Sequence, residues 1–349
     1  MILLLYLVVI VVSTVVVWKA SGLLETNAAR LATHYRLPPL VQGAVITAVG
    51  SSFPELSSTV IATLVHGEFA LGVAGIVGSA VFNILVIPGL SGLISGRMAS
   101  DRLLVYKDAQ FYITSVAVLL LAFSFALIYH PVPGAPWQGE MTRGVALVPL
   151  GLYVLYLFLQ QQDTAEHRVD LKKEEAGVPP DTSAIDVPVA RAWGLLALSL
   201  ALTVVGVEGL VWASIGLGDF FETPSFLWGL TVIAAGTSLP DALVSIRAAR
   251  AGDHVVSFAN VLGSNIFDLL VAIPAGVLVA GAAVIDFAAA MPLMGFLTFA
   301  TIVLFAMLRT GLELRRTEAA ILLGVYALFL VWIALETLGV TDWTQGAAV

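Results

Sequence analysis

Long apolar runs separated by short polar segments make up most of this chain of 349 residues. A helix needs about 20 apolar residues to cross the hydrocarbon core of a bilayer. Runs of that length predict ten spanning helices, at residues 2–18, 38–65, 68–95, 108–130, 143–160, 192–217, 225–250, 254–280, 283–308 and 318–338. We therefore expect an all-α integral membrane protein. The first run has no basic leader before it, so we expect it to be a mature helix.

One long polar connection, at about residues 161–190, divides the predicted helices into two sets of five. It contains Pro179 and Pro180, which disfavour a continuous helix. We expect a flexible linker there, with one five-helix unit at residues 1–160 and a second at residues 191–349. Because each unit has an odd number of spans, the second must enter the membrane upside down relative to the first, as in the inverted repeats of secondary transporters.

Lysine and arginine gather in short cytoplasmic loops, and their distribution predicts the orientation of the chain. If both termini lie outside the cell membrane and the linker lies inside, fifteen of the 16 basic residues become cytoplasmic and Arg143 alone lies outside. Those fifteen are Lys19, Arg30, Arg36, Arg97, Arg102, Lys107, Arg168, Lys172, Lys173, Arg191, Arg247, Arg250, Arg309, Arg315 and Arg316.

Composition supports the membrane assignment and removes several function classes. The chain is 59% hydrophobic and 11% charged, whereas soluble domains average about 25% charged residues. The net charge is −8 and no basic stripe suggests nucleic acid. The absence of cysteine excludes thiolate metal sites and cysteine nucleophiles. The expected partners are the lipid bilayer and inorganic cations, with no cofactor and no obligatory protein partner.

Two short motifs occur once in each predicted unit. The sequence GSSFPE at residues 50–55 recurs as GTSLPD at 236–241, and GSAVFN at 78–83 recurs as GSNIFD at 263–268. Residues four apart share a helical face, so each motif predicts a column of hydroxyl and carboxylate or amide oxygens. The four pairs are Ser51 with Glu55, Thr237 with Asp241, Ser79 with Asn83, and Ser264 with Asp268.

Proline within two of these motifs predicts additional oxygen donors. Because proline lacks an N–H group and clashes with the carbonyl four residues earlier, Pro54 and Pro240 would free carbonyls in the preceding turns. The carbonyls concerned are those of Gly50, Gly236, Ala48 and Ala234. A site built only from oxygen favours hard cations such as Ca²⁺ and Na⁺ over zinc or copper.

Glu55, Asp241 and Asp268 lie deep in apolar runs. A carboxylate at the bilayer centre costs about 2.5–3.5 kcal/mol on insertion scales, so three together indicate a function rather than a structural coincidence. A proline kink, a Gly-Ser packing contact or a back-bonded hydroxyl is an ordinary structural feature when it occurs alone. Glu208 lies toward the outer end of its span, where it either snorkels to the interface or lines an access path.

These motifs resemble the α-repeats of the sodium/calcium exchanger superfamily of cation/calcium antiporters, most specifically over residues 43–90 and 229–276. Residues 78–85, 236–241 and 263–268 are similar to those of the potassium-dependent sodium/calcium exchangers, and the short linker is similar to that of prokaryotic members. The resemblance implies Na⁺/Ca²⁺ antiport by alternating access, with the first and sixth spans sliding across the remaining helices.

The resemblance also implies a set of cation ligands. Glu55 and Asp241 would form the central Ca²⁺ site, with oxygens from Ala48, Ser51, Ser52, Ala234, Thr237 and Ser238. Sodium sites would add Ser79, Asn83, Ser264 and Asp268. Ser51 stands where threonine is usual, and Asp241 where many members have glutamate.

The three carboxylates carry a charge of −3 when ionised, which three Na⁺ would neutralise, as would one Ca²⁺ with one K⁺ or one proton. Asp268 is therefore either protonated when Ca²⁺ binds or a K⁺ ligand. A proton-coupled Ca²⁺ exchanger on the same fold is the nearest alternative. An intramembrane protease is a remote alternative, because all five histidines fall at span ends or in loops. We expect a transporter and not an enzyme.

Overall fold

A computed structural model describes residues 1–35, 48–102, 104–174, 188–341 and 343. Nine helices in these ranges are long and apolar enough to cross a membrane. Each matches a predicted run, and together they confirm an all-α integral membrane protein. The remaining run, 38–65, lies partly outside the described residues, and its described part forms two shorter helices.

The first half of the chain contains α1 (Ile2–His34), α2 (Ala48–Ser51), α3 (Phe53–Leu64), α4 (Phe69–Ser95), the π-helical turn η2 (Leu104–Asp108), α5 (Ala109–Tyr129) and α6 (Arg143–Glu174). The second half contains α7 (Val189–Phe221), α8 (Ser225–Trp228), η3 (Gly229–Ile233), α9 (Ala234–Ala251), α10 (His254–Phe267), η4 (Asp268–Ala272), α11 (Ile273–Ala280), α12 (Phe287–Arg309) and α13 (Arg316–Thr337). Helix α6 continues through residues 161–174, where the polar sequence predicted the start of a linker.

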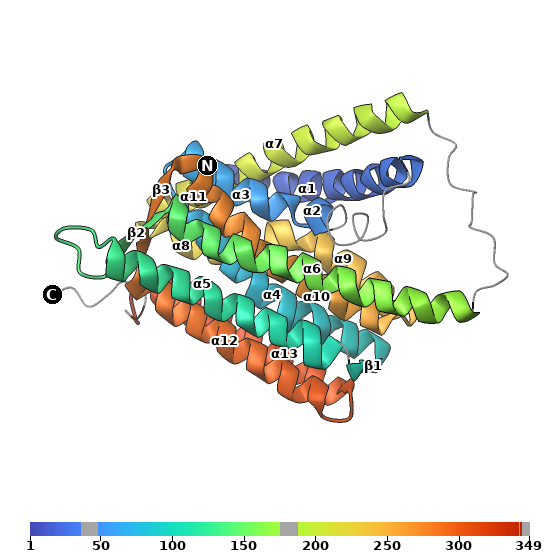
Figure 1. Cartoon of the computed structure of the whole chain (residues 1–349). Coiled ribbons are helices and arrows are strands. Elements are labelled where there is room, and N and C mark those ends of the chain that lie inside the picture. Colours follow the sequence, from blue (N-terminus) through green and yellow to red (C-terminus); the bar gives the residue numbers. More distant parts are fainter. Residues whose placement is uncertain (36–47, 103, 175–187, 342, 344–349) are drawn as a thin grey trace.

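Helices α1 and α7 lie side by side along one edge of the molecule (Figure 1). Each has 33 residues, or about 50 Å at 1.5 Å per residue, so α1 extends well beyond its predicted run and α7 extends a few residues beyond its own at each end. Glycines in α7 permit the close approach, since a Cβ atom on Gly206 would lie 2.8 Å from a methyl group of Val17. Small residues serve the same purpose in other membrane helix pairs.

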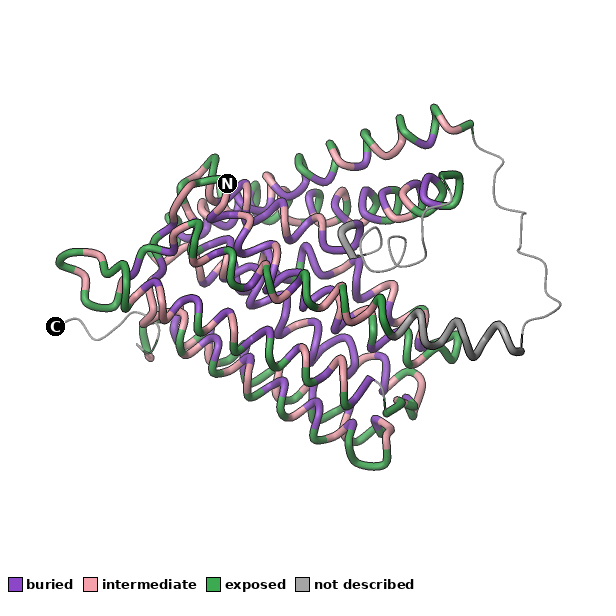
Figure 2. The backbone as a smooth tube through the Cα atoms, viewed as in Figure 1, coloured by how far each residue is buried: buried purple, intermediate pink, exposed green. Residues whose placement is uncertain are grey.

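Helix α4 occupies the centre of the bundle, where buried residues concentrate (Figure 2). In its most apolar window 83% of residues are buried, compared with 17% for α1. Helix α4 packs against α9, η3 and α13. A Cβ atom on Gly78 would lie 2.8 Å from both the Cα atom of Leu230 and the Cβ atom of Ala234. The absence of a side chain at Gly78 therefore lets two motif-bearing spans touch.

Two short antiparallel ribbons connect the halves, and the sequence pattern did not predict them. Strand β1 (Arg97–Ala99) pairs with β4 (Glu313–Arg315), and β2 (Gln138–Thr142) pairs with β3 (Ala282–Asp286). The ribbons lie at opposite ends of the molecule (Figure 1). Strands β1 and β3 follow corresponding spans of the two halves, and so do β2 and β4. Each ribbon contains one strand from each half.

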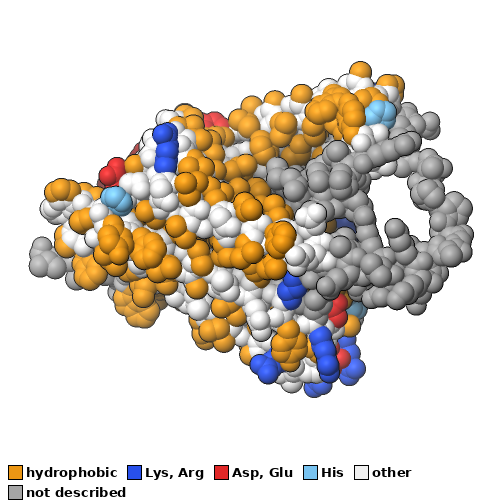
Figure 3. Space-filling model, viewed as in Figure 1, with side chains coloured by type: hydrophobic (Ala, Val, Ile, Leu, Met, Phe, Trp, Pro, Cys, Tyr) orange, Lys and Arg blue, Asp and Glu red, His pale blue; other side chains and the backbone are white. Residues whose placement is uncertain are grey.

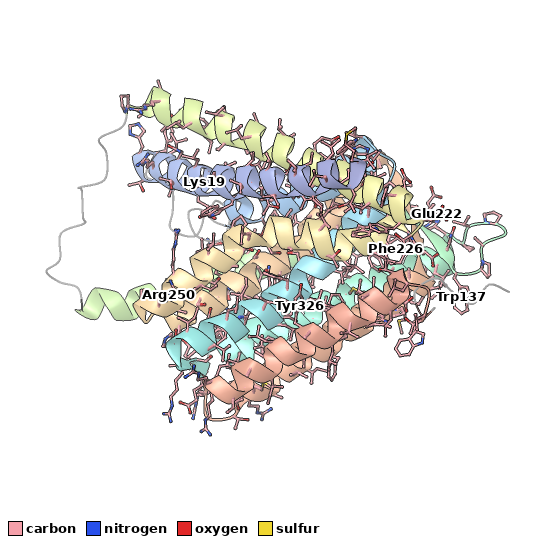
Figure 4. All side chains as sticks on the ribbon, turned by 180° about the vertical axis from the view of Figure 1, so that it is seen from behind. Lys19, Trp137, Glu222, Phe226, Arg250 and Tyr326 are labelled. Atoms are coloured by element: carbon pink, nitrogen blue, oxygen red, sulfur yellow. The ribbon has the colours of Figure 1, made fainter. Side chains whose placement is uncertain are left out.

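The surface has the polarity expected of a spanning bundle. Figure 3 shows an apolar band around the middle of the molecule, with Lys and Arg side chains gathered mainly at the end where β1 lies. Seen from behind, Arg250 lies near one end, whereas Trp137 and Glu222 lie near the other (Figure 4). Trp137 is 54% exposed, as is usual for tryptophan at a membrane interface.

Candidate cation site

The first motif interrupts its span. Helix α2 ends at Ser51, and α3 begins at Phe53 with Pro54 in its first turn. The N–H group of Leu56 donates to the carbonyl of Ser52 at 3.0 Å, which starts the new helix. Ser51 and Glu55 are therefore not on one continuous helix as predicted, because the break at Ser52 separates them. Both side chains are nevertheless buried.

The second motif remains helical. Helix α9 runs from Ala234 to Ala251 through Pro240, so Thr237 and Asp241 keep the predicted spacing of four residues on one helix. Pro240 has no N–H group to donate to Gly236. The irregularity here is the π-helical turn η3, which immediately precedes α9. Thr237 donates its hydroxyl hydrogen to the carbonyl of Ile233 at 3.1 Å, which leaves its oxygen lone pairs available.

The other two motifs lie on α4 and at the junction of α10 with η4. Ser79 and Asn83 are both on α4, while Ser264 is on α10 and Asp268 is the first residue of η4. All four side chains are buried. Single π-helical turns are frequent at functional sites, and here one begins at a buried carboxylate.

Two serine pairs join the halves in a reciprocal way. The hydroxyl oxygens of Ser52 and Ser264 are 2.9 Å apart, and those of Ser79 and Ser238 are 2.6 Å apart. Ser52 and Ser238 hold the same place in their motifs, as do Ser79 and Ser264. The two contacts are therefore equivalent under exchange of the halves.

Asp241 receives hydrogen bonds at one of its oxygens. Ser264 donates to Asp241 Oδ2 at 2.5 Å, and Asn83 Nδ2 lies 3.5 Å from the same atom. Because the Ser264 hydrogen is used in this bond, Ser52 is the donor in its contact with Ser264. A chain of hydrogen bonds thus runs from Ser52 through Ser264 to Asp241.

Several buried oxygens close to this chain have no hydrogen-bond partner among the described residues. They are both carboxylate oxygens of Glu55, both of Asp268, Oδ1 of Asp241 and Oδ1 of Asn83. A buried polar group without a partner costs about 1–3 kcal/mol, and more when charged. The carboxylate of Asp268 lies close enough to those of Glu55 and Asp241 to interact with them by Coulomb repulsion. This concentration of unpartnered negative oxygen is suited to receiving a cation.

The described side chains do not include three Asp, Glu, His or Cys residues that converge as a metal-binding group by themselves. Hydroxyl and amide groups contribute further buried oxygens from the same motifs: the paired hydroxyls of Ser52 with Ser264 and of Ser79 with Ser238, and the amide of Asn83, with Ser264 and Asn83 in contact with Asp241. A mixture of carboxylate, hydroxyl and amide oxygens matches the preferences of Ca²⁺ and Na⁺ rather than those of a transition metal.

Glu208 lies outside this network. Its Oε1 is 3.0 Å from Nε2 of His66, in the turn after α3, and its side chain is 40% exposed. The predicted alternatives for Glu208 were snorkelling and lining an access path, and neither included this partner. Of the other predicted ligands, Thr237, Ser51 and Ala234 are buried, whereas the side chain of Ala48 lies outside the described residues.

Sequence reasoning missed Asn265 and Tyr112. Asn265 is fully buried and contacts Asn83, the carbonyl of Ala80 and the hydroxyl of Tyr112. Comparison of the repeats did not single it out because the equivalent residue in the first half is Ala80. An asparagine within a buried apolar run was itself a signal.

The fold is that of a multi-pass membrane protein with a buried, oxygen-lined core. The family description "Sodium/calcium exchanger protein" matches residues 5–161 and 191–335, so the chain belongs to the sodium/calcium exchanger family of antiporters.

Similar proteins agree with this membership. The chain is 29% identical to "Putative antiporter CaxA" from Alkalimonas amylolytica over 324 residues, which cover 91% of this chain and 95% of that protein. It is 41% identical to mouse "Sodium/potassium/calcium exchanger 4" over 125 residues, covering 35% of this chain and 17% of that protein. A solved structure of the sodium-calcium exchanger NCX_Mj, soaked with 100 mM Na⁺ and 10 mM Sr²⁺, matches with a TM-score of 0.56 at 22% identity and covers 94% of this chain and 98% of that one.

Proposed function

We propose that this protein exchanges Na⁺ for Ca²⁺ across a cell membrane by alternating access. The observation that carries the proposal is the group of buried carboxylate oxygens on Glu55, Asp241 and Asp268 that have no partner among the described residues. Ions that carry two or three positive charges in total would neutralise most of this negative charge. Transport then follows if the protein rearranges readily when the site is filled and poorly when it is empty and charged, since unpaired charge in a low-dielectric interior is costly.

The proposed roles follow the predicted ligand set. Glu55 and Asp241 form the central Ca²⁺ site, and the serine and asparagine oxygens complete the coordination of Ca²⁺ or Na⁺. The full set is Glu55, Asp241, Ala48, Ser51, Ser52, Ala234, Thr237, Ser238, Ser79, Asn83, Ser264 and Asp268. The reciprocal serine contacts support a site shared equally between the two halves.

We also propose that the halves, residues 1–160 and 191–349, are inverted repeats with both termini outside the cell and the linker inside. The ribbons support this arrangement, because the equivalent strands β1 and β3 lie at opposite ends of the bundle (Figure 1). The gathering of basic side chains at the β1 end supports a cytoplasmic position for that end.

Helices α1 and α7 are proposed to slide together across the other spans. They pack closely on each other. In the described residues, every strand lies in a connection between later helices of its half: β1 follows α4, β2 follows α5, β3 follows α11 and β4 follows α12. No strand adjoins α1 or α7. The ribbons therefore tie the remaining spans of the two halves to each other. The pair α1 and α7 is not held by either ribbon.

The test of the proposed function is Ca²⁺ flux in proteoliposomes that contain the full chain. An outward Na⁺ gradient is expected to drive uptake of radioactive Ca²⁺ at constant pH, because the two ions compete for the same oxygens. Uptake driven by a proton gradient and indifferent to Na⁺ would replace the proposal with the proton-coupled exchanger. Absence of Ca²⁺ movement under every gradient would reject both.

Asp268 is expected to make transport dependent on K⁺. In the first half the equivalent residue is the neutral Asn83, which directs the NH₂ group of its amide toward Asp241, whereas Asp268 is a carboxylate within Coulomb range of Glu55 and Asp241. The similarity to a sodium/potassium/calcium exchanger over 125 residues supports the same role. We expect added K⁺ at constant pH to stimulate Ca²⁺ uptake by the wild type, and Asp268→Asn to lose that stimulation because the negative ligand is gone. If the rate of Ca²⁺ uptake by the wild type does not change when K⁺ is added, protonation of Asp268 is favoured instead.

A further inference from the structure

We propose that Asn265 is a positioning residue that turns the amide of Asn83 so that its oxygen, and not its nitrogen, is available to the transported cation. This inference rests on the proposed function, because it assigns a role to a residue beside the same cation site. Asn265 itself has both polar atoms engaged with protein groups, so it acts through Asn83.

The orientation of the Asn265 side chain is fixed by a backbone carbonyl. Its Nδ2 donates to the carbonyl oxygen of Ala80 at 3.2 Å and lies 3.2 Å from the hydroxyl of Tyr112. A carbonyl oxygen can only accept a hydrogen bond. The reversed amide would place Oδ1 of Asn265 against the oxygen of Ala80, so Oδ1 must point away from that oxygen, toward Asn83 one turn further along α4.

Asn83 on α4 is oriented in turn by two acceptors. Its Nδ2 donates to Oδ1 of Asn265 at 3.0 Å and lies 3.5 Å from Oδ2 of Asp241. A reversed Asn83 amide would bring its oxygen against both of these oxygens. The oxygen of Asn83 is therefore directed away from them, where it is buried and has no partner among the described residues.

The consequence concerns the sign of the partial charge offered to a cation. An asparagine can present either an acceptor oxygen or a donor NH₂ group, and these attract and repel a cation respectively. Asp268, the equivalent of Asn83 in the second half, offers an oxygen in either orientation. Only the amide needs an orienting neighbour, and Asn265 supplies it from the position that alanine occupies in the first half.

The experiment compares Asn265→Leu in the wild-type background with the same substitution in an Asn83→Ala background. The readout is the dissociation constant for Ca²⁺ and for Na⁺, measured by calorimetry on the full chain in detergent. In the wild-type background the substitution is expected to weaken binding on the order of tenfold to a hundredfold, the usual effect of removing a group that orients a ligand. In the Asn83→Ala background no further weakening is expected, because there is no oxygen left to orient.

Asn27→Leu is the matched control, since Asn27 is also buried but its side-chain hydrogen bonds among the described residues stay within its own helix: it donates to the carbonyl of Leu23 at 2.7 Å, and its Oδ1 accepts from Arg30 at 3.5 Å. It is expected to bind cations as the wild type does. If Asn265→Leu does not elute as a folded, monodisperse protein, Asn265→Ser replaces it, because serine is too short to reach both Ala80 and Asn83.

Each result has a distinct meaning. Equal weakening by Asn265→Leu in the two backgrounds would show a purely structural role and overturn the proposal, as would unchanged affinity in the wild-type background. If the wild type binds neither cation, the proposed function fails together with the positioning role. If the wild type binds and only the Asn265 comparison fails, the proposed function stands and the positioning role alone is rejected.

Discussion

Glu55→Gln is expected to abolish Na⁺-driven Ca²⁺ flux while leaving the protein folded. Both oxygens of Glu55 are buried without a hydrogen-bond partner among the described residues, so removing the negative charge breaks no hydrogen bond of the described fold. Glutamine keeps the shape but removes that charge, and a divalent ion loses a full negative ligand. Because a buried unpaired charge destabilises a fold, the apo variant is expected to melt at the same temperature as the wild type or higher.

The measurement is radioactive Ca²⁺ uptake in proteoliposomes, paired with a thermal unfolding curve of the apo protein. Glu336→Gln is the matched control. Glu336 is buried in α13, but its Oε1 accepts hydrogen bonds from the indole of Trp332 at 3.1 Å and the backbone N–H group of Trp343 at 3.0 Å. Glu336→Gln is expected to retain flux. Normal transport by Glu55→Gln would remove Glu55 from the cation site.

A reversible cross-link between α7 and the turn after α3 is expected to stop transport. His66 and Glu208 contact each other across this boundary at 3.0 Å, and sliding of α1 with α7 would separate them. The chain contains no cysteine, so a double variant with cysteines at positions 66 and 208 reacts with a short bifunctional thiol reagent at those positions alone. Flux is expected to fall to background after cross-linking and to return when a reductant cleaves the reagent.

The control places cysteines at positions 35 and 193 instead. Tyr35 and Trp193 also contact each other, with the indole nitrogen 3.2 Å from the phenol oxygen, but they connect the end of α1 to the start of α7. If the two helices move as a unit, this cross-link leaves flux intact. Full transport by the cross-linked 66–208 variant would contradict sliding of α7 past the turn after α3.

The sequence was a reliable guide wherever a single physical effect determined the result. A continuous run of about 20 apolar residues in lipid satisfies its own backbone hydrogen bonds as a helix, so the nine spans in the described residues were all predicted. The cost of a carboxylate in an apolar run likewise indicated Glu55, Asp241 and Asp268 from their sequence positions alone, and all three are buried.

Other features depended on contacts between distant segments and could not be predicted from local pattern. Equivalent prolines gave different results, because Pro54 follows a break at Ser52 whereas Pro240 lies within the continuous helix α9. Periodicity predicts which residues share a face only while the helix continues. Asn265 was missed for a different reason, since comparison of repeats detects only positions at which both copies carry chemistry.

The two β-ribbons also have a consequence for how the protein is made. Strands β1 and β2 are synthesised long before their partners β4 and β3, and an unpaired strand edge leaves backbone donors and acceptors exposed. The first five spans therefore leave the ribosome with both ends of their bundle unfinished. The edges of β1 and β2 stay unpaired until residues 282–286 and 313–315 have been translated, so the ribbons can close only after both partner strands of the second half have been made.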